Sequence, residues 1–409
     1  MPAATVPRIV FVNRHYWPSE AATAQLLTDL AEGLAGRGRS VAVVASHDGS
    51  VTTSFEEDRR GVHISRVRAT RWGRRSLLGK ACDYLTFTLA CRRVLPRRLQ
   101  ERDWLVPMTD PPTLALVAAA AGRRTNVRVA HWIQDIHPEI SLALPGRRIL
   151  RLLSIPWIRR RDAAWRSAEA CIAISQDMAA VVAEHGVPPA KIQVIHNWAP
   201  GGGDLTPVAP DQNPLRREWN VADQFVVAYS GNLGRVHALE PVLAATALLR
   251  DDRRLTFLFI GDGPQRPALQ AAVAQRRLTN VRFLPPQPRD RLAESLSVGD
   301  VHLVTLRAGC ERFVYPSKLY GVLAAGRPIV FVGPPRCELA EAVRRRGAGL
   351  VADPNDPGAV AAAIRALHAD PARREKMGRA AADWFRATGG LRSALDDWEK
   401  LLHEPPRQT

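Results

Sequence analysis

The chain has 409 residues, of which 46% are hydrophobic and 24% are charged. This balance is typical of globular proteins and excludes a mostly disordered chain, and the length fits two domains of roughly 200 residues each. No apolar run approaches the roughly 18–20 residues that a membrane-spanning helix needs. The segment Met1–Pro7 lacks a charged stretch followed by an apolar core, so we expect no secretion signal.

Five cysteines are scattered through the chain, and none belongs to a CxxC pair: Cys82, Cys91, Cys171, Cys310 and Cys337. A zinc knuckle, a redox motif or a disulfide framework is therefore not expected. We expect a reduced, cytoplasmic protein.

The formal net charge is +17, and two N-terminal segments hold much of the excess. Arg66–Asp103 has eleven basic against three acidic residues, and Arg147–Arg166 has seven against one. Both interleave arginines with large apolar residues, a pattern that fits a helix lying on an anionic membrane surface. A core-facing helix with a solvated basic face is the alternative. Nucleic-acid binding is disfavoured, because no groove-reading module or set of stacking aromatics is recognisable.

Short apolar runs in the first half of the chain predict buried parallel strands separated by helices. They lie at residues 8–13, 40–46, 62–69, 104–108, 127–132, 170–175 and 192–196. Residues 199–223 are rich in glycine and proline and predict a linker.

The same pattern restarts at residue 224. Strands are expected at 225–230, 255–260, 281–284, 301–306 and 328–332, helices at 239–250, 266–275, 289–297 and 317–325, and an almost wholly helical stretch at 359–403. We therefore predict an α/β protein of two doubly wound, Rossmann-like domains, at 1–198 and 224–385, with a C-terminal helix at 386–409. Ligands bind such sheets beyond the carboxyl ends of their strands. We therefore expect the ligand site in a cleft between the two domains.

Several common signatures are absent from the sequence. There is no GxxxxGK[ST] phosphate loop, no GxGxxG fingerprint, no GxSxG elbow and no DxD pair. These absences argue against an ATPase, a Rossmann dehydrogenase, a serine hydrolase and a metal-bridged transferase.

Three loops at predicted strand ends carry candidate site residues. In Ser230–Arg235, glycines let the backbone approach a ligand and Arg235 could pair with a phosphate, although a tight turn explains the glycines equally well. In Tyr315–Gly321, Pro316 starts a helix that Ser317 can cap, and the helix N–H groups together with Lys318 favour an anion, with a plain helix cap as the alternative. In Ala130–Glu139, His131 fits the core, whereas Asp135, His137 and Glu139 are candidates for contacting a hydroxyl.

These residues resemble glycosyltransferase family 4, which has the GT-B fold, and in particular its bacterial surface-polysaccharide branch of fucosaminyl- and colanic-acid-type transferases. The resemblance runs over nearly the whole chain. It includes Ile174–Gln176, Gly186–Ile192, Val194–Trp198, Tyr229–Gly234, Gly261–Pro264, Val281–Pro285, Pro316–Pro328, Glu338, Gly347 and Gly349.

The resemblance implies a nucleotide-sugar donor, with UDP favoured, held mainly by the C-terminal domain, and an acceptor held by the N-terminal domain. No cofactor or metal is required, and the anomeric configuration is retained. By position it implies donor contacts from Gly231, Asn232, Leu233, Phe283, Leu284, Pro285, Pro316, Ser317 and Tyr320. Lys318, Arg235 and Asp135 would be catalytic, and Ser19, Glu20, His137 and Glu139 would face the acceptor.

The chain departs from the family pattern at the E-x7-E motif, where Phe313 and Gly321 replace the glutamates. Glu311, two residues early, could replace the first of them in the catalytic site. Ala21-Ala22 also replaces the glycine pair of the first loop.

We therefore expect a glycosyltransferase of surface-polysaccharide synthesis that acts at the inner face of the plasma membrane, on a polyprenyl-diphosphate-linked saccharide. An anionic membrane surface is an expected partner and nucleic acid is not. A GT-B-fold sugar-nucleotide epimerase, or a non-catalytic sugar-nucleotide-binding partner, remains the alternative.

Overall fold

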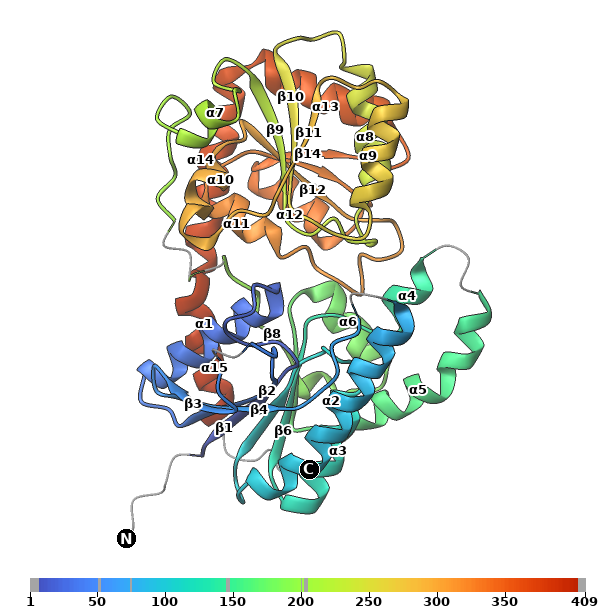
Figure 1. Ribbon diagram of the computed structural model, residues 1–409, viewed down its shortest axis with the longest axis vertical. Coiled ribbons are helices and arrows are strands. Elements are labelled where there is room, and N and C mark those ends of the chain that lie inside the picture. Colours follow the sequence, from blue (N-terminus) through green and yellow to red (C-terminus); the bar gives the residue numbers. More distant parts are fainter. Residues whose placement is uncertain are drawn as a thin grey trace. The chain divides into compact units, whose positions relative to one another are not determined.

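The computed structural model describes residues 7–50, 53–73, 76–144, 148–199, 201 and 205–403. The chain forms two compact units (Figure 1). The N-terminal unit comprises 1–197 together with Phe313–Tyr315 and Leu391–Thr409, and the C-terminal unit comprises 198–312 and 316–390. Each unit is a mainly or wholly parallel sheet with helices on both faces, which confirms two doubly wound α/β units.

The sheet of the N-terminal unit has the order β3-β4-β2-β1-β5-β6-β7-β8. The strands are β1 (Ile9–Val12), β2 (Val41–Ser46), β3 (Glu56–Arg59), β4 (Val62–Val67), β5 (Trp104–Pro107), β6 (Arg128–Ile133), β7 (Ala170–Ala173) and β8 (Ile192–Val194). The helices are α1 (Ala22–Gly36), α2 (Leu77–Arg98), α3 (Leu114–Thr125), α4 (Glu139–Ala143), α5 (Arg148–Ser167), α6 (Gln176–Glu184) and α15 (Gly390–His403). The edge strand β3, which the sequence analysis does not predict, pairs antiparallel with β4.

The sheet of the C-terminal unit has the order β11-β10-β9-β12-β13-β14, and all its pairings are parallel. The strands are β9 (Phe225–Ser230), β10 (Leu255–Ile260), β11 (Val281–Leu284), β12 (Val301–Thr305), β13 (Ile329–Val332) and β14 (Gly349–Ala352). The helices are α7 (Pro214–Glu218), α8 (Leu239–Leu248), α9 (Arg266–Gln275), α10 (Leu292–Ser297), α11 (Lys318–Ala324), α12 (Glu338–Arg346), α13 (Pro357–Ala369) and α14 (Pro371–Thr388).

The predicted linker at 199–223 is shorter in the structure. Residues 200 and 202–204 lie outside the described residues, but Pro214–Glu218 forms α7. Leu215 of this helix is fully buried against the sheet, and the buried Arg216 bonds the carboxylate of Asp300 (3.1 Å). This packing makes residues 213–221 part of the C-terminal unit. The linker prediction failed at Pro214 because a proline at the first helical position starts a helix as readily as a proline ends one.

Helix α15 supplies part of the N-terminal core. Its buried face consists of Ala394, Leu395, Trp398, Leu401 and Leu402. The indole of Trp398 is fully buried, with ring centroids 6.0 Å from Phe11 of β1 and 5.3 Å from Trp132 of β6. Such edge-to-face aromatic contacts and the large area that they bury make this helix a principal source of stability for the unit.

We expect Trp398→Ala to lower the free energy of unfolding by about 3–5 kcal/mol, because the substitution removes a fully buried indole and leaves a cavity. Urea unfolding followed by circular dichroism measures the change. Trp72→Ala is the matched control, since the Trp72 side chain is 54% exposed in the same unit and should change stability by less than about 0.5 kcal/mol. Equal losses in the two variants would contradict this account of α15.

Candidate functional site

The C-terminal sheet reverses its strand order next to β9. From β9 the chain builds outward through β10 to β11, and it then returns to the other side of β9 to build β12, β13 and β14. The loops that follow β9 and β12 therefore leave the sheet in opposite directions. Such a switch point opens a crevice at the carboxyl ends of the two strands, where ligands of doubly wound sheets bind.

Lys318 lies at this switch point and is held by two neutral side chains. Its ammonium donates to the hydroxyl of Tyr229 and to Nε2 of His237 (3.2 Å). The Tyr229 hydroxyl in turn donates to the carbonyl oxygen of Asn232 (2.7 Å), and Nδ1 of His237 donates to the carbonyl oxygen of Thr305 (2.7 Å). Residues that follow β9, β12 and the Pro316–Ser317 turn thus meet in one hydrogen-bonded cluster.

Desolvation dominates the electrostatics of this cluster. Burial lowers the pKa of Lys318 well below its ordinary value, and burial together with the Lys318 charge lowers the pKa of His237 to about 3. His237 is therefore neutral at physiological pH and presents the lone pair of Nε2 to Lys318. Among the described residues, no carboxylate lies within ion-pair distance of Lys318, so its charge would be neutralised best by an anion from outside.

The loop after β9 brings its backbone close to this lysine. Gly231 has φ +126°, and a Cβ added there would lie 3.4 Å from Cε of Lys318. Gly231 and Asn232 are both exposed. Pro316 is buried and Ser317 is half-buried, directly before α11. Contrary to the expected cap, the Ser317 side chain makes no capping hydrogen bond.

Other predicted donor residues occupy different surroundings. Leu233 is fully buried in the core, and Tyr320 is also buried, so neither side chain faces solvent. The Phe283 ring is half-buried and stacks on buried Phe259 (5.2 Å between centroids), which ties it to the core. Leu284 is half-buried, whereas Pro285 and Arg235 are exposed at loop positions.

Glu311 follows β12 and is half-buried. Its Oε2 atom is buried and has no hydrogen-bond partner among the described residues. A buried carboxylate oxygen without a donor is costly, so this atom is a candidate acceptor for a ligand hydroxyl.

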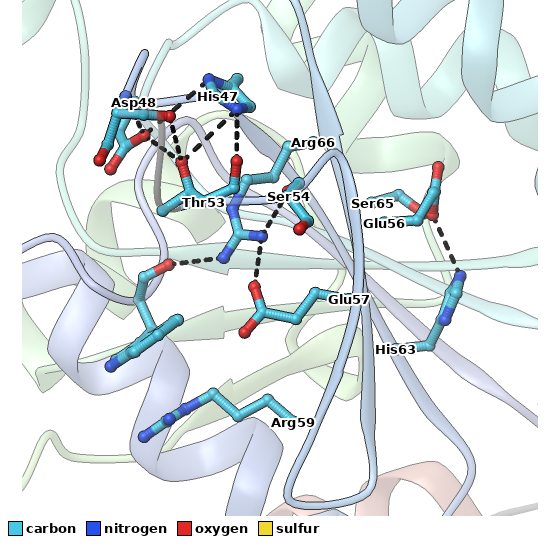
Figure 2. A network of polar contacts seen from close by, with 12 residues as sticks. His47, Asp48, Thr53, Ser54, Glu56, Glu57, Arg59, His63, Ser65 and Arg66 are labelled. Atoms are coloured by element: carbon cyan, nitrogen blue, oxygen red, sulfur yellow. Dashed lines mark hydrogen bonds and ion pairs between the residues drawn. The ribbon is translucent and has the colours of Figure 1, made fainter.

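The N-terminal sheet has its own switch point next to β1, which lies between β2 and β5. A pocket of about 900 Å³ lies over the carboxyl ends of β1, β2 and β4, and Ser19 and Glu20 line it, as do His47, Asp48 and Arg66. Figure 2 shows how the last three are held: Arg66 points to Glu57 and Ser54, with which it bonds at 2.7 and 2.8 Å, and His47 and Asp48 converge on Thr53.

Asp135 and His137 line a second, much smaller cavity of about 20 Å³ in the same unit. Desolvation raises the pKa of Asp135, and the nearby Asp110 raises it further against the opposing charges of His137 and Lys80. The backbone of Asp135 also pairs with Val314, and the amide of Ile136 donates to the carbonyl oxygen of Phe313 (2.9 Å).

Glu139 belongs to a buried ionic network, whereas the sequence analysis expects it to face the acceptor substrate. Its carboxylate pairs with the buried guanidinium of Arg161, which also bonds Asp162 (2.7 Å) and donates to the carbonyl oxygen of His137 (2.7 Å). Arg161 therefore fixes the backbone beside His137, and Glu139 acts on the site through Arg161.

Helix α5 has an exposed apolar face in its first half. Leu152 and Leu153 are 72% and 71% exposed, Leu150 and Ile155 are also exposed, and the exposed arginines Arg151, Arg159 and Arg160 flank them. The core-facing alternative from the sequence thus does not hold for these positions. Arg147 and the side chain of Ile149 lie outside the part of the chain that the structure describes. Within the described ranges, no helix is both long enough and apolar enough to span a bilayer.

The sequence analysis did not single out several residues that form these sites. Tyr229 lies within a strand whose apolar pattern predicts core, yet both its ring (3.8 Å from the centroid to Nζ) and its hydroxyl contact Lys318. Arg14 and Asp110, which bond each other (3.2 Å), follow β1 and β5. The sequence signal that could have identified Arg14 and Asp110 is their position directly after the two central strands.

Two doubly wound parallel-sheet units in tandem define the GT-B class, and solved glycosyltransferases share this fold. HepE of Anabaena, whose structure is of a complex with UDP-glucose, aligns with a TM-score of 0.73 at 17% identity and covers 97% of this chain and 99% of its own. The family models for "Glycosyl transferase 4-like domain" and "Glycosyl transferases group 1" match residues 22–198 and 224–370. The chain therefore belongs to the glycosyltransferases that combine these two domains.

Two bacterial relatives agree with this assignment. WcaI of Escherichia coli K12, named for glycosyl transfer in colanic acid biosynthesis, is 28% identical over 258 residues, which is 62% of each protein. WbjE of Pseudomonas aeruginosa, named as a glycosyltransferase, is 28% identical over 275 residues, or 66% of this chain and 67% of that protein. The chain thus matches about two thirds of the length of each relative.

The lowered pKa of Lys318 predicts a pH-dependent difference in stability between the wild type and Lys318→Met. Between the lowered folded pKa and the ordinary value of 10.5, the unfolded chain binds more protons than the folded one, so wild-type stability rises with pH. Relative to Lys318→Met, the free energy of unfolding should rise by up to about 1.4 kcal/mol per pH unit within that window.

Urea unfolding at several values between about pH 7 and pH 10 measures this difference. Lys376→Met, which removes an exposed lysine of α14, is the control and should run parallel to the wild type. A Lys318→Met curve that is also parallel would show that the ammonium is not desolvated.

Proposed function

We propose that the chain transfers a sugar from a nucleotide-diphosphate sugar to a lipid-linked saccharide during the synthesis of a cell-surface polysaccharide. The observation that carries this proposal is the Lys318 ammonium, which lies beside the glycine loop at the switch point of the C-terminal sheet without a carboxylate partner among the described residues. A diphosphate supplies the missing negative charge. The UDP-glucose complex of HepE favours a UDP-sugar, and the names of the bacterial relatives favour polysaccharide synthesis.

In this reaction the bond between the anomeric carbon and the diphosphate oxygen breaks, the acceptor hydroxyl oxygen forms a new bond to that carbon, and the hydroxyl proton passes to the departing diphosphate. Negative charge grows on the departing diphosphate in the transition state. Lys318 stabilises that charge, and Tyr229 and His237 keep the ammonium in position, so little reorganisation is needed during the reaction. Glu311 has a buried oxygen to accept a donor hydroxyl.

Two features of the reaction are proposed from the family resemblance. The product keeps the anomeric configuration of the donor, and no metal ion takes part. The part of the chain that is described contains no cluster of three or more His, Cys, Asp or Glu side chains suited to a metal. Undiminished turnover in excess EDTA would support metal independence, and a loss that Mg²⁺ or Mn²⁺ restores would overturn it.

We expect Lys318→Met to lower turnover by about 100–1,000-fold, because one preorganised donor to the developing charge is lost. The assay measures release of UDP from a UDP-sugar in the presence of a lipid-linked saccharide extract. Lys376→Met is the control and should keep wild-type turnover.

Wild-type turnover by a folded Lys318→Met protein would remove Lys318 from the mechanism. Acceptor-independent conversion of the donor into its epimer would replace the transferase with an epimerase. Donor binding without turnover on any acceptor extract would favour a non-catalytic binding partner.

The second part of the proposal is that α5 docks the N-terminal unit on an anionic bilayer. Its exposed leucines match the apolar region below the headgroups, and Arg151, Arg159 and Arg160 match the negative lipid charge. Such a location, at the inner face of the plasma membrane, would bring the enzyme to a polyprenyl-diphosphate-linked acceptor.

We expect Leu152→Ser/Leu153→Ser to weaken binding to vesicles that contain anionic lipid by on the order of 10-fold or more, since two apolar side chains no longer enter the bilayer. Cosedimentation measures binding, which should also weaken as salt rises. Leu248→Ser, which changes a 53% exposed leucine of the C-terminal unit, is the control. Equal binding of wild type to neutral and anionic vesicles would contradict the role of the arginines.

A further inference from the structure

The large pocket of the N-terminal unit contains more positive charge than the fold uses. Four basic side chains line it, from the loop after β1, strand β4, the segment between β4 and α2, and α2 itself: Arg14, Arg66, Arg71 and Lys80. Two of them form ion pairs within the protein. Arg66 is buried and pairs with Glu57 (2.7 Å), and Arg14 pairs with Asp110 (3.2 Å).

Arg71 and Lys80 are different. Both side chains are exposed, and neither has a carboxylate within ion-pair distance among the residues that the structure describes. Three acidic residues line the pocket, of which Glu20 is exposed and Asp48 and Asp83 are engaged by the protein. Asp83 accepts from the backbone amides of Trp72 (2.8 Å) and Gly73 (2.9 Å), and Asp48 accepts from the amide of Ser50 (2.8 Å).

These hydrogen bonds stabilise the charged form of both carboxylates and orient them toward the backbone amides that donate to them. Desolvation alone would raise the pKa of Asp83, but the bonds from Trp72, Thr70 and Gly73 outweigh it and lower the pKa. The same balance, with Thr53 and Ser50 as donors, lowers the pKa of Asp48. The two carboxylates therefore brace the loops, and Arg71 and Lys80 remain available to a ligand.

The fold also holds these two cations at defined places. The guanidinium of Arg71 lies against Gly49, where a Cβ would be 2.0 Å from Nη2, and Gly49 has φ +76°. Glycine at this position thus makes room for the guanidinium. The ammonium of Lys80 lies 5.4 Å from the centroid of the Tyr84 ring, on which Arg14 also lies (5.0 Å).

We propose that Arg71 and Lys80 bind a phosphate or diphosphate group of the acceptor, which makes the acceptor an anionic, phosphate-bearing saccharide. This inference rests on the proposed function, in which the N-terminal unit holds the acceptor. A guanidinium matches two phosphate oxygens in a bidentate manner, an ammonium adds a point charge, and the two together balance a doubly charged group. The pocket volume of about 900 Å³ leaves room for the attached saccharide.

Inorganic pyrophosphate tests the site directly. Isothermal titration of the full-length protein with pyrophosphate is performed in saturating UDP, which occupies the site at Lys318. We expect Arg71→Gln/Lys80→Gln to weaken this binding by on the order of 10- to 100-fold, because two charge-assisted contacts are lost. Lys80→Arg keeps the charge and should bind within a few-fold of the wild type.

Arg93→Gln is the matched control, since Arg93 is an exposed arginine of the same helix outside the pocket. Equal pyrophosphate affinity in the wild type and in a folded double variant would overturn the proposal, as would an equal loss in Arg93→Gln. UDP affinity is measured separately. If UDP does not bind the wild type, the proposed donor site fails, while the pyrophosphate comparison still decides on the pocket.

Kinetics distinguishes the two sources of such a group. A polyprenyl-diphosphate-linked saccharide and a lipid-free sugar phosphate are compared as acceptors. The one that the enzyme uses should show a 10- to 100-fold higher KM in the double variant, with UDP affinity unchanged. Equal use of an uncharged saccharide by the wild type and the double variant, with no preference for either phosphorylated compound, would overturn the proposal.

Discussion

A cation without a counter-charge is the constraint on which the candidate site depends. Removing an ammonium from water is costly, and the usual compensation is a carboxylate. Lys318 instead has a phenol and a neutral imidazole as its acceptors. Both partners accept a hydrogen bond but supply no negative charge, so the free protein disfavours the charged form of Lys318, and an anion at the carboxyl ends of β9 and β12 would favour it. An anionic ligand that enters there relieves a cost that the fold has already incurred.

Basic side chains without a carboxylate partner also occur in the N-terminal unit, at the other switch point. There Asp83 is bonded to two backbone amides, and two basic side chains that have no ion-pair partner among the described residues line an open pocket. Each unit thus builds its cationic region from loops that leave a parallel sheet at its carboxyl end, where the strand order reverses. Sheet topology decides where the ligand regions lie, and the pairing of individual side chains decides their charge.

Much of this fold could be predicted from the sequence, because strands buried on both faces are continuous apolar runs. Val281–Leu284 and Phe225–Ser230 have the predicted bounds. The strand Glu56–Arg59 could not be found in this way, since an exposed edge strand of charged residues has no apolar pattern. The prolines and polar neighbours of Pro214–Glu218 predict a linker, although the same residues that break a chain pattern also start helices.

The site could be predicted at the level of loops but less well at the level of side chains. Position after a strand identified Lys318 and Gly231, whose side chain and backbone do come together. It could not distinguish Leu233, which turns into the core, from Asn232, which does not. Nor could it assign Tyr229 to the site, because the residue lies in an apolar strand pattern although its ring and hydroxyl both contact Lys318. These distinctions depend on which way a loop turns, which is a property of tertiary packing.

The arrangement of α15 has a consequence for biosynthesis. The ribosome makes this helix only after the entire C-terminal unit, yet its indole at position 398 fills the space between Phe11 and Trp132. The first half of the nascent polypeptide must therefore wait, with an aromatic surface uncovered, while the second half emerges and folds. A fragment that ends before α15 would leave that aromatic surface uncovered permanently.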